Sequence, residues 1–454
     1  MNKRLQIMES APVGKALLYL GLPTIVGLSV TGFYQLSISY FVAKLGTQAM
    51  GAISIVYPLT LIMPGIGLLF GNGGAAYIAE LLGAGEKERA ETVLASTLFY
   101  CLFFSVLTQL LLPVLPTLLV WMGASSTVLP MALEYSRILV ISFLFHMSSV
   151  CLMNLVRAEG NVALSTISQM TGSILNIILA PILIFWFDWG IRGAAIATAT
   201  AQCVAFLILI QYYLRKKSYL KLDFRKVRVH RWILEPVLRI GVPLLGVNLF
   251  QSISMTGANV VAAPYGDSVV AGLGIANRVI GMTTLAVNGF SRGYQTFISY
   301  SFGAGYMDRI RQATRKAYTW SISGGLLISA LQIVFAVPIA SAFSKDPEVI
   351  RIASRALIAG SLLFATYGLQ AISTVYLLCV KYNWAGFLFS ISRQGLAYLP
   401  LLWVFERLFQ VTGIFYTQAA ADAVTTGILI VFLILTQKKR DAMLGTPGLP
   451  RAGG

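Results

Sequence analysis

The chain has 454 residues, of which 57% are hydrophobic and only 11% are charged. A soluble protein of this length needs far more charged surface, so the composition excludes that class and indicates a protein embedded in a membrane. Mostly apolar segments of about 20 to 30 residues recur along the chain, long enough to cross a hydrocarbon core. They lack period-two alternation, which predicts helices rather than barrel strands.

Apolar segments separated by charged or glycine- and proline-rich breaks predict an all-α polytopic membrane protein with twelve transmembrane helices. The expected helices lie at about 13–43, 50–82, 91–121, 128–157, 162–187, 192–215, 233–262, 268–302, 310–343, 348–380, 384–405 and 412–436. An even number of crossings places both termini on the same side of the membrane.

The first helix carries a polar stripe, formed by Thr24, Thr31, Gln35 and Ser39 at helical spacing. Two interpretations are open for these side chains: they line a substrate site, or they tie neighbouring helices together. The same alternatives apply to further amides and a phenol in the first and seventh helices. The candidate lining residues are Tyr34, Gln35, Ser39, Asn248 and Gln251.

Two titratable side chains of the N-terminal half are candidates for coupling transport to an ion gradient. Glu80 lies near the end of the second helix, and His146 lies midway along the fourth. Histidine titrates near neutral pH, which suits a proton carrier. The alternatives are a hydrated Glu80 at the membrane surface and a neutral, hydrogen-bonded His146 in the core.

Positive charge gathers in alternate loops and accounts for much of the net charge of +17. Such loops are cytoplasmic under the positive-inside rule, so we expect both termini in the cytoplasm of a cell membrane protein. Attraction to anionic lipid explains this charge without a nucleic acid partner. The largest group lies between the two predicted halves: Arg215, Lys216, Lys217, Lys221, Arg225, Lys226, Arg228 and Arg231.

An internal repeat divides the chain into two halves. Gly21-Leu22-Pro23 recurs as Gly241-Val242-Pro243, and the same displacement along the chain relates Gly46 to Gly266, Gly83-Ala84-Gly85 to Gly303-Ala304-Gly305, and Gly193 to Gly413. The predicted domains are a six-helix bundle at 1–214, a basic linker at 215–232, a second six-helix bundle at 233–440 and a tail at 441–454. Six helices per copy predict pseudo-two-fold symmetry, a central cleft and alternating access.

The eighth helix carries an ionisable residue, Arg292, with Asn288 and Gln295 on the same face. The repeat places Asn72 at the equivalent position, so this charge belongs to one half only. A charge inside a membrane needs a partner or water. Arg292 therefore either locks the bundle through backbone carbonyls or an aspartate, reaches the membrane surface, or offers a fixed positive charge to an anionic or zwitterionic substrate.

Arg393 and Asp422 are the other deeply placed charges, in the eleventh and twelfth helices. They are expected either to form a structural salt bridge, which Arg292 joins in one cluster, or to take part in ion coupling.

The sequence gives little indication of a metal site or of enzyme activity. The four cysteines lie in apolar segments without zinc-site spacing, and there are only two histidines. The chain has no P-loop, HExxH or GxSxG motif, which excludes an ATP-driven pump built from this chain alone. We expect a protein that is not an enzyme and has no cofactor.

Several stretches resemble the multidrug and toxic compound extrusion (MATE) family over nearly the whole chain. They are GLPTIVGLSVTGFYQLSISYFVAKLGTQAMGAISIVYP at 21–58, GNGGAAYIAELLGAGEKERA at 71–90, GLGIANRVIG at 272–281, GYQTFISYSFGAGYMDRIRQA at 293–313 and SISRQGLAYLPL at 390–401. The resemblance implies two six-helix bundles around a V-shaped cleft and export of small organic molecules. It also implies an inward proton or sodium gradient as the driving force. We expect a monomer in contact with membrane lipid.

One position departs from the family pattern. Members commonly carry an aspartate in the first helix, and here the corresponding residue is Ile38. The expected function is a secondary active exporter. An uncoupled facilitator, a lipid-linked oligosaccharide flippase and, from another class, a membrane scaffold or intramembrane enzyme remain alternatives.

Overall fold

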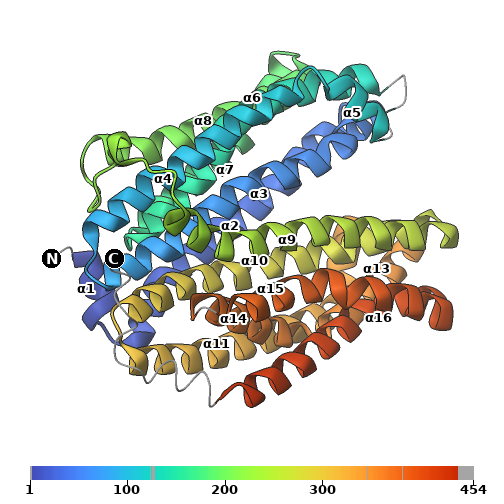
Figure 1. Cartoon of the computed structure of the whole chain (residues 1–454). Coiled ribbons are helices and arrows are strands. Elements are labelled where there is room, and N and C mark those ends of the chain that lie inside the picture. Colours follow the sequence, from blue (N-terminus) through green and yellow to red (C-terminus); the bar gives the residue numbers. More distant parts are fainter. Residues whose placement is uncertain (1–2, 123, 125–127, 345, 381, 438–454) are drawn as a thin grey trace. The chain divides into compact units, whose positions relative to one another are not determined.

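The computed structural model describes residues 3–122, 124, 128–344, 346–380 and 382–437, and these residues form helices and connecting turns without any strand (Figure 1). The predicted tail at 441–454 lies outside the described residues, as do the basic residues Lys438, Lys439 and Arg440.

The first half of the chain contains one helix that the sequence did not predict, the short α1 (Lys3–Ser10). The predicted third helix is divided into α4 and α5. The elements are α2 (Val13–Ala43), α3 (Thr47–Gly83), α4 (Lys87–Leu107), η1 (Thr108–Leu111), α5 (Leu115–Trp121), α6 (Leu129–Ala158), α7 (Val162–Pro181), η2 (Ile182–Trp186), α8 (Gly190–Leu214) and η3 (Phe224–Lys226).

In the second half, the predicted ninth and tenth helices are each divided in two. The elements are α9 (Arg231–Ala262), η4 (Ala263–Tyr265), α10 (Asp267–Gly303), α11 (Met307–Val334), α12 (Ala336–Phe343), α13 (Pro347–Ser361), α14 (Phe364–Cys379), α15 (Asn383–Ile391), η5 (Ser392–Leu396) and α16 (Tyr398–Leu435).

The chain forms two compact units, each with its own packed core. Unit 1 contains Met1–Ala11 and Leu22–Asn248, and unit 2 contains Pro12–Gly21 and Leu249–Gly454. The basic linker at 215–232 therefore belongs to unit 1. The beginning of α2 packs within unit 2 and the beginning of α9 within unit 1, so each unit includes a short segment from the other half of the sequence.

Ten helices of the described residues are long and apolar enough to cross a membrane, and the bent pair α13 and α14, which meet at 46°, supplies an eleventh span. The segment Trp384–Leu435 has 52 residues, or about 78 Å of helix, more than twice a hydrocarbon core of roughly 30 Å. Gln410 interrupts it with a left-handed backbone conformation, at φ 53°. The segment therefore provides two crossings, at the place where the sequence predicted a break between helices.

Backbone conformation follows the repeat. Gly46 and Gly266 precede α3 and α10 with φ values of 106° and 104°, and Gly85 and Gly305 follow the same helices with φ values of 78° and 73°. After each helix the chain closes the same turn, with an N–H to C=O distance of 2.9 Å from Glu86 to Leu81 and from Tyr306 to Ser301. Glycine adopts positive φ without the steric cost of a Cβ atom, which explains its presence at these equivalent positions.

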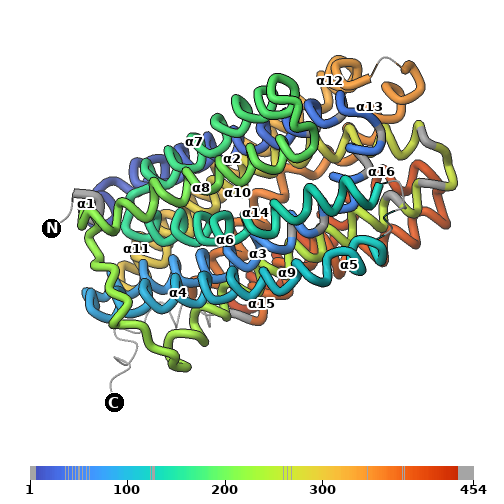
Figure 2. The backbone as a smooth tube through the Cα atoms, turned by 90° about the horizontal axis from the view of Figure 1, so that it is seen from above, coloured from blue at the N-terminus to red at the C-terminus, as the bar shows by residue number. Residues whose placement is uncertain are grey.

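Close helix contacts in unit 1 depend on small residues. α6 runs beside both α3 and α8 (Figures 1 and 2). A Cβ atom on Gly67 would lie 2.6 Å from the Met147 carbonyl oxygen, and one on Gly71 would lie 2.9 Å from the Cα atom of Cys151. The four-residue spacing of these glycines lets the backbones of α3 and α6 approach, as in other membrane helix pairs.

Candidate functional site

A buried ion pair joins the two limbs of the segment Trp384–Leu435, one limb before Gln410 and the other after it. The Nε atom of Arg393 donates to Oδ1 of Asp422 at 2.7 Å, and Nη2 lies 3.4 Å from Oδ2. The side chain of Arg393 is 7% exposed and that of Asp422 is fully buried. The sequence prediction that these two residues form a salt bridge is confirmed.

The backbone around Arg393 is a π-helical turn, η5. The N–H of Ala397 donates to the carbonyl of Ser392 at 2.9 Å, which is the wider spacing of this turn. The Ser254 hydroxyl of α9 donates to the carbonyl of Gln394. Such turns occur mostly as single insertions in α-helices and frequently lie at functional sites. Here the turn places the guanidinium opposite α16.

Amide side chains hold the Asp422 region in place. Gln418 donates to Oδ1 of Asp422 at 3.2 Å. From α14, Gln370 donates both to the Asp422 carbonyl at 3.2 Å and to the Thr426 hydroxyl at 2.8 Å. Each carboxylate oxygen of Asp422 therefore contacts a donor, which offsets part of the cost of burying the charge.

Tyr367 extends this network to α10. The Arg393 guanidinium lies 4.1 Å from the centre of the Tyr367 ring, and the Tyr367 hydroxyl donates to Oδ1 of Asn288 at 2.6 Å. Arg393 thus binds a carboxylate and stacks on an aromatic ring at once. Sequence reasoning did not select Tyr367, because both of its partners are distant from it in the chain.

Arg292 does not join the ion pair of Arg393 and Asp422. Its guanidinium has no hydrogen bond or ion pair with the described side chains, and Tyr367 is the titratable group with which it interacts electrostatically. The residue is partly buried. Of the alternatives open for Arg292, a single cluster of three charges is not what the described side chains form: Arg393 and Asp422 pair with each other, and Arg292 lies near Tyr367.

A second arginine of α10, Arg278, was not selected from the sequence. Its side chain is exposed, and it forms no ion pair with a described acid. At 100° per residue, the 14 positions between Arg278 and Arg292 bring them within about 40° of each other around the helix axis. This spacing is the feature of the sequence from which Arg278 could have been selected together with Arg292.

The polar side chains of α2, which include the predicted stripe and Tyr34, differ in their surroundings. Thr31 accepts from Gln169 at 3.1 Å and lies 3.4 Å from Ser173, so this part of the stripe joins α2 to α7. Tyr34 is partly buried, and Gln35 is exposed. The side chain of Ser39 lies outside the described residues.

At the repeat position of Asp422, unit 1 carries an uncharged side chain. The repeat equivalent of Asp422 is Gln202, whose Oε1 atom lies 3.5 Å from the Ser149 hydroxyl. The His146 imidazole is partly buried and has no hydrogen-bond partner within the described part of the chain. Of these two equivalent positions, only Asp422 in the second half of the sequence carries a charge.

The remaining candidates of the sequence analysis are Asn248, Gln251, Gln295 and Glu80. The Asn248 amide donates to the Leu244 carbonyl of its own helix at 3.1 Å, and Gln251 is exposed. Gln295 is partly buried on α10. Glu80 lies near Tyr77 at the end of α3, next to the turn that contains the Glu86–Arg89 ion pair.

Two buried acids that the sequence did not single out fasten the basic linker to unit 1. Glu91 accepts from Lys226 at 2.5 Å and from the backbone N–H of Lys221 at 3.1 Å. Glu159 accepts from the Ser218 hydroxyl at 2.6 Å and from the Tyr219 N–H at 3.1 Å. Burial raises the pKa of Glu159 against the lowering effect of these donors, whereas the hydrogen bond to Glu91 raises the pKa of Lys226.

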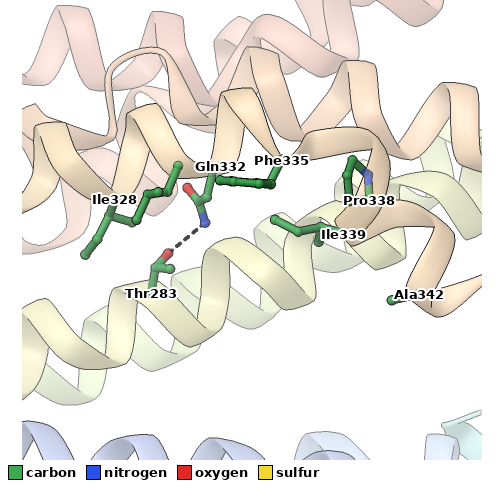
Figure 3. Close-up of a pocket in the computed structure, with 8 residues that line it drawn as sticks. Thr283, Ile328, Gln332, Phe335, Pro338, Ile339 and Ala342 are labelled. Atoms are coloured by element: carbon green, nitrogen blue, oxygen red, sulfur yellow. Dashed lines mark hydrogen bonds between the residues drawn. The ribbon is translucent and has the colours of Figure 1, made fainter.

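A separate apolar pocket of about 580 Å³ lies between α10, α11 and α12. Figure 3 shows Gln332 pointing toward Thr283, to which it donates at 3.3 Å, and its carbonyl oxygen accepts from Ser361 at 2.9 Å. The only two polar side chains that line the pocket, Thr283 and Gln332, are therefore already hydrogen-bonded. The lining residues are Thr283, Ile328, Leu331, Gln332, Phe335, Pro338, Ile339 and Ala342.

No group of three or more metal-ligating side chains occurs in the part of the chain that the structure describes. The centre around Asp422 consists of its ion pair with Arg393 and the amides of Gln370 and Gln418.

Comparison with known proteins places this chain in a family. The family model MatE matches residues 23–182 and 243–404, and the two ranges begin at Pro23 and Pro243, which are equivalent positions of the internal repeat. The multidrug export protein MepA of Staphylococcus saprophyticus is 28% identical over 98% of this chain and 100% of its own length. MepA of Staphylococcus aureus strain MSSA476 is 26% identical over 95% of this chain and 96% of its own length.

Solved structures share the fold. A MATE protein in complex with MaL6 superposes with a TM-score of 0.93 at 22% identity, covering 98% of this chain and all of that one. A transporter of the MOP superfamily from Pyrococcus furiosus, described as having a binding pocket of reversed polarity, superposes with a TM-score of 0.91 at 22% identity and the same coverage. Because the family model matches more than half of the sequence, the chain belongs to the MATE family of multi-pass membrane transporters.

Proposed function

We propose that this protein is a secondary active exporter of small organic compounds, driven by an inward proton or sodium gradient. Its relatives named as multidrug export proteins support the substrate class. The internal repeat supports alternating access, since transporters built from two repeats commonly move one against the other around a central site. The basic loops support cytoplasmic termini in a cell membrane.

The observation that carries ion coupling is the fully buried Asp422 in ion pair with Arg393. A carboxylate inside a membrane is a site for a proton or a sodium ion when its cationic partner withdraws. In this proposal, the pair is closed in the ion-free state. Separation of the two limbs releases the carboxylate to take up the driving ion, and the pair re-forms after the ion has left. In this proposal Asp422 is the acid that binds the driving ion, because the first helix has Ile38 where family members commonly have an aspartate.

The test is transport in proteoliposomes with an imposed pH gradient, a sodium gradient or neither, using a cationic and an anionic fluorescent dye. The proposal expects one of the gradients to drive accumulation of dye against its concentration, and expects Asp422→Asn to remove accumulation. Asp308→Asn is the matched control, because Asp308 is an exposed acid of the same unit. Equal accumulation by wild type and Asp422→Asn would refute the coupling role. Equilibration without accumulation by wild type would show an uncoupled facilitator.

A further inference from the structure

We propose that Arg292, together with Asn288 and Gln295 on α10, binds an acidic group of the transported compound, so that the preferred substrates are small organic anions or zwitterions. The inference rests on the proposed export function and names the chemical class of its substrate. The acidic group is a carboxylate, sulfonate or phosphate, which a planar guanidinium binds through two parallel hydrogen bonds.

The first argument is the distribution of charge within unit 2. Its described acidic side chains already have partners: Asp308 pairs with Arg311, Glu348 with Arg351, Asp422 with Arg393, and Glu406 accepts from Tyr265, while Asp346 caps the start of α13. Arg292 has none of these as a partner. A lone charge within a membrane-spanning helix is costly unless an opposite charge or water compensates it. An anion is therefore the ligand that this position lacks.

The second argument is the set of hydrogen-bond donors beside Arg292. Tyr367 donates to the Asn288 carbonyl oxygen, which leaves the two N–H groups of the Asn288 amide without a partner among the described residues. Asn288 and Gln295 lie four residues before and three residues after Arg292, within about 60° of it around α10. The face thus offers N–H donors with a single positive charge and no carboxylate.

The orientation of this face is fixed by the neighbouring network. Arg393 stacks on the Tyr367 ring at 4.1 Å while it binds Asp422, and Tyr367 in turn holds Asn288. A ring and amide already held in place lose little freedom when a ligand binds. The same contacts connect the anion site to the residue proposed for ion coupling.

A third argument comes from Arg278, which lies about 21 Å along α10 from Arg292, near the same face. It is exposed and has no described acidic partner. Two like charges on one helix face raise the local concentration of anions and lower that of cations. Arg278 is therefore expected to attract the substrate, whereas Arg292 binds it.

The test is equilibrium binding to purified protein in nanodiscs of zwitterionic lipid, measured by fluorescence anisotropy. The probes are carboxyfluorescein, an anion, and rhodamine 6G, a cation built on a similar ring system. Wild type is expected to bind carboxyfluorescein the more tightly. Arg292→Gln is expected to weaken this binding by about tenfold or more, the value of a lost charged hydrogen bond, and to leave rhodamine binding unchanged or tighter.

Two variants keep the result interpretable. Arg292→Lys retains the charge without the planar fork and is expected to keep part of the affinity for the anion. Arg355→Gln removes an exposed arginine of α13 in the same unit and is expected to bind like wild type. Preference of wild type for rhodamine, or equal loss of both probes in Arg292→Gln with Arg292→Lys intact, would overturn the assignment.

A final arm separates a soluble anion from a lipid headgroup. If phosphatidylglycerol in the nanodisc displaced carboxyfluorescein from wild type, the occupant would be lipid, and the substrate assignment would be wrong. Unchanged binding supports a soluble substrate. Because none of these measurements needs a gradient, their outcome is independent of whether the protein proves to be ion-coupled.

Discussion

The guanidinium of Arg393 contacts both carboxylate oxygens of Asp422, at 2.7 and 3.4 Å, in a region from which solvent is almost excluded. The two residues lie 29 positions apart, on opposite sides of the chain reversal at Gln410. The ion pair therefore joins two successive crossings of the membrane. Any movement that separates these crossings has to exchange the partner of Asp422.

Replacing only one of the two residues of this ion pair is expected to destabilise the protein strongly. Arg393→Met leaves Asp422 buried without its cation and should cost about 3–5 kcal/mol. The double variant Arg393→Met with Asp422→Leu removes both charges and should recover most of that loss. Thermal unfolding in detergent of wild type, the two single variants Arg393→Met and Asp422→Leu, and the double variant measures the effect as a double-mutant cycle. Losses that simply add would mean that the two side chains contribute independently.

The chain reversal before Gly413 is expected to tolerate no side chain at that position. A Cβ atom there would collide with the Phe405 carbonyl oxygen, as one on the repeat-equivalent Gly193 would lie 2.6 Å from the Leu183 carbonyl oxygen. Gly413→Ala should therefore lower stability by about 1–3 kcal/mol.

Gly427 offers a matched control on the same helix, because a Cβ atom there would meet nothing within 4 Å. Gly427→Ala should leave stability unchanged or raise it by up to ~1 kcal/mol, since alanine favours helix. Equal unfolding midpoints for the two variants would contradict the close contact at Gly413.

The buried Glu159 predicts a dependence of stability on pH. Burial raises its folded-state pKa, so the native state holds a proton that the unfolded chain releases near its ordinary pKa of about 4.3. This stabilising contribution is present below that value and is lost as the pH rises through the folded-state pKa. Glu159→Gln should flatten the corresponding part of the profile of unfolding midpoint against pH.

Glu88→Gln is the control for this profile, because Glu88 is an exposed acid and should leave the slope as in wild type. A wild-type midpoint that rises with pH through this range, or the same slope in Glu159→Gln, would contradict the assignment.

The attachment of the basic linker to unit 1 is expected to depend on Glu91. Glu91→Ala removes the acceptor for both Lys226 and the Lys221 N–H. The linker should then open more readily, and trypsin should cleave after its lysines and arginines several times faster, because cleavage follows the population of the open form. Limited proteolysis followed by mass spectrometry measures this rate. Unchanged cleavage, or an equal increase in Glu88→Ala, would show that Glu91 does not hold the linker.

The sequence predicted features that follow from local pattern. Glycines that recur at one constant displacement predicted a duplication, and two of the pairs, Gly46 with Gly266 and Gly85 with Gly305, adopt matching positive φ values in both copies. Low charge within long apolar segments predicted the spans, and the rarity of charge in them singled out Arg393 and Asp422 as partners. These signals depend on spacing along the chain or on a residue type that is rare in its surroundings.

Other features depend on contacts between distant segments and left no such signal. Tyr367 resembles the other tyrosines of the chain until the fold brings Arg393 and Asn288 to it. Glu91 and Glu159 look like ordinary acids near helix ends, yet the linker covers both. The isolation of Arg292 could not be inferred either, because Asp422 was an equally available partner in the sequence.

The central claim, that export is coupled to an ion, is tested most directly by letting substrate drive the ion. Proteoliposomes are loaded with a transported dye and a lumenal pH or sodium indicator, with no ion gradient, and diluted into dye-free buffer. An antiporter predicts that outward movement of dye acidifies the lumen or raises its sodium concentration, and that Asp422→Asn loses this response. Release of dye from wild-type proteoliposomes with neither protons nor sodium entering the lumen would contradict the account.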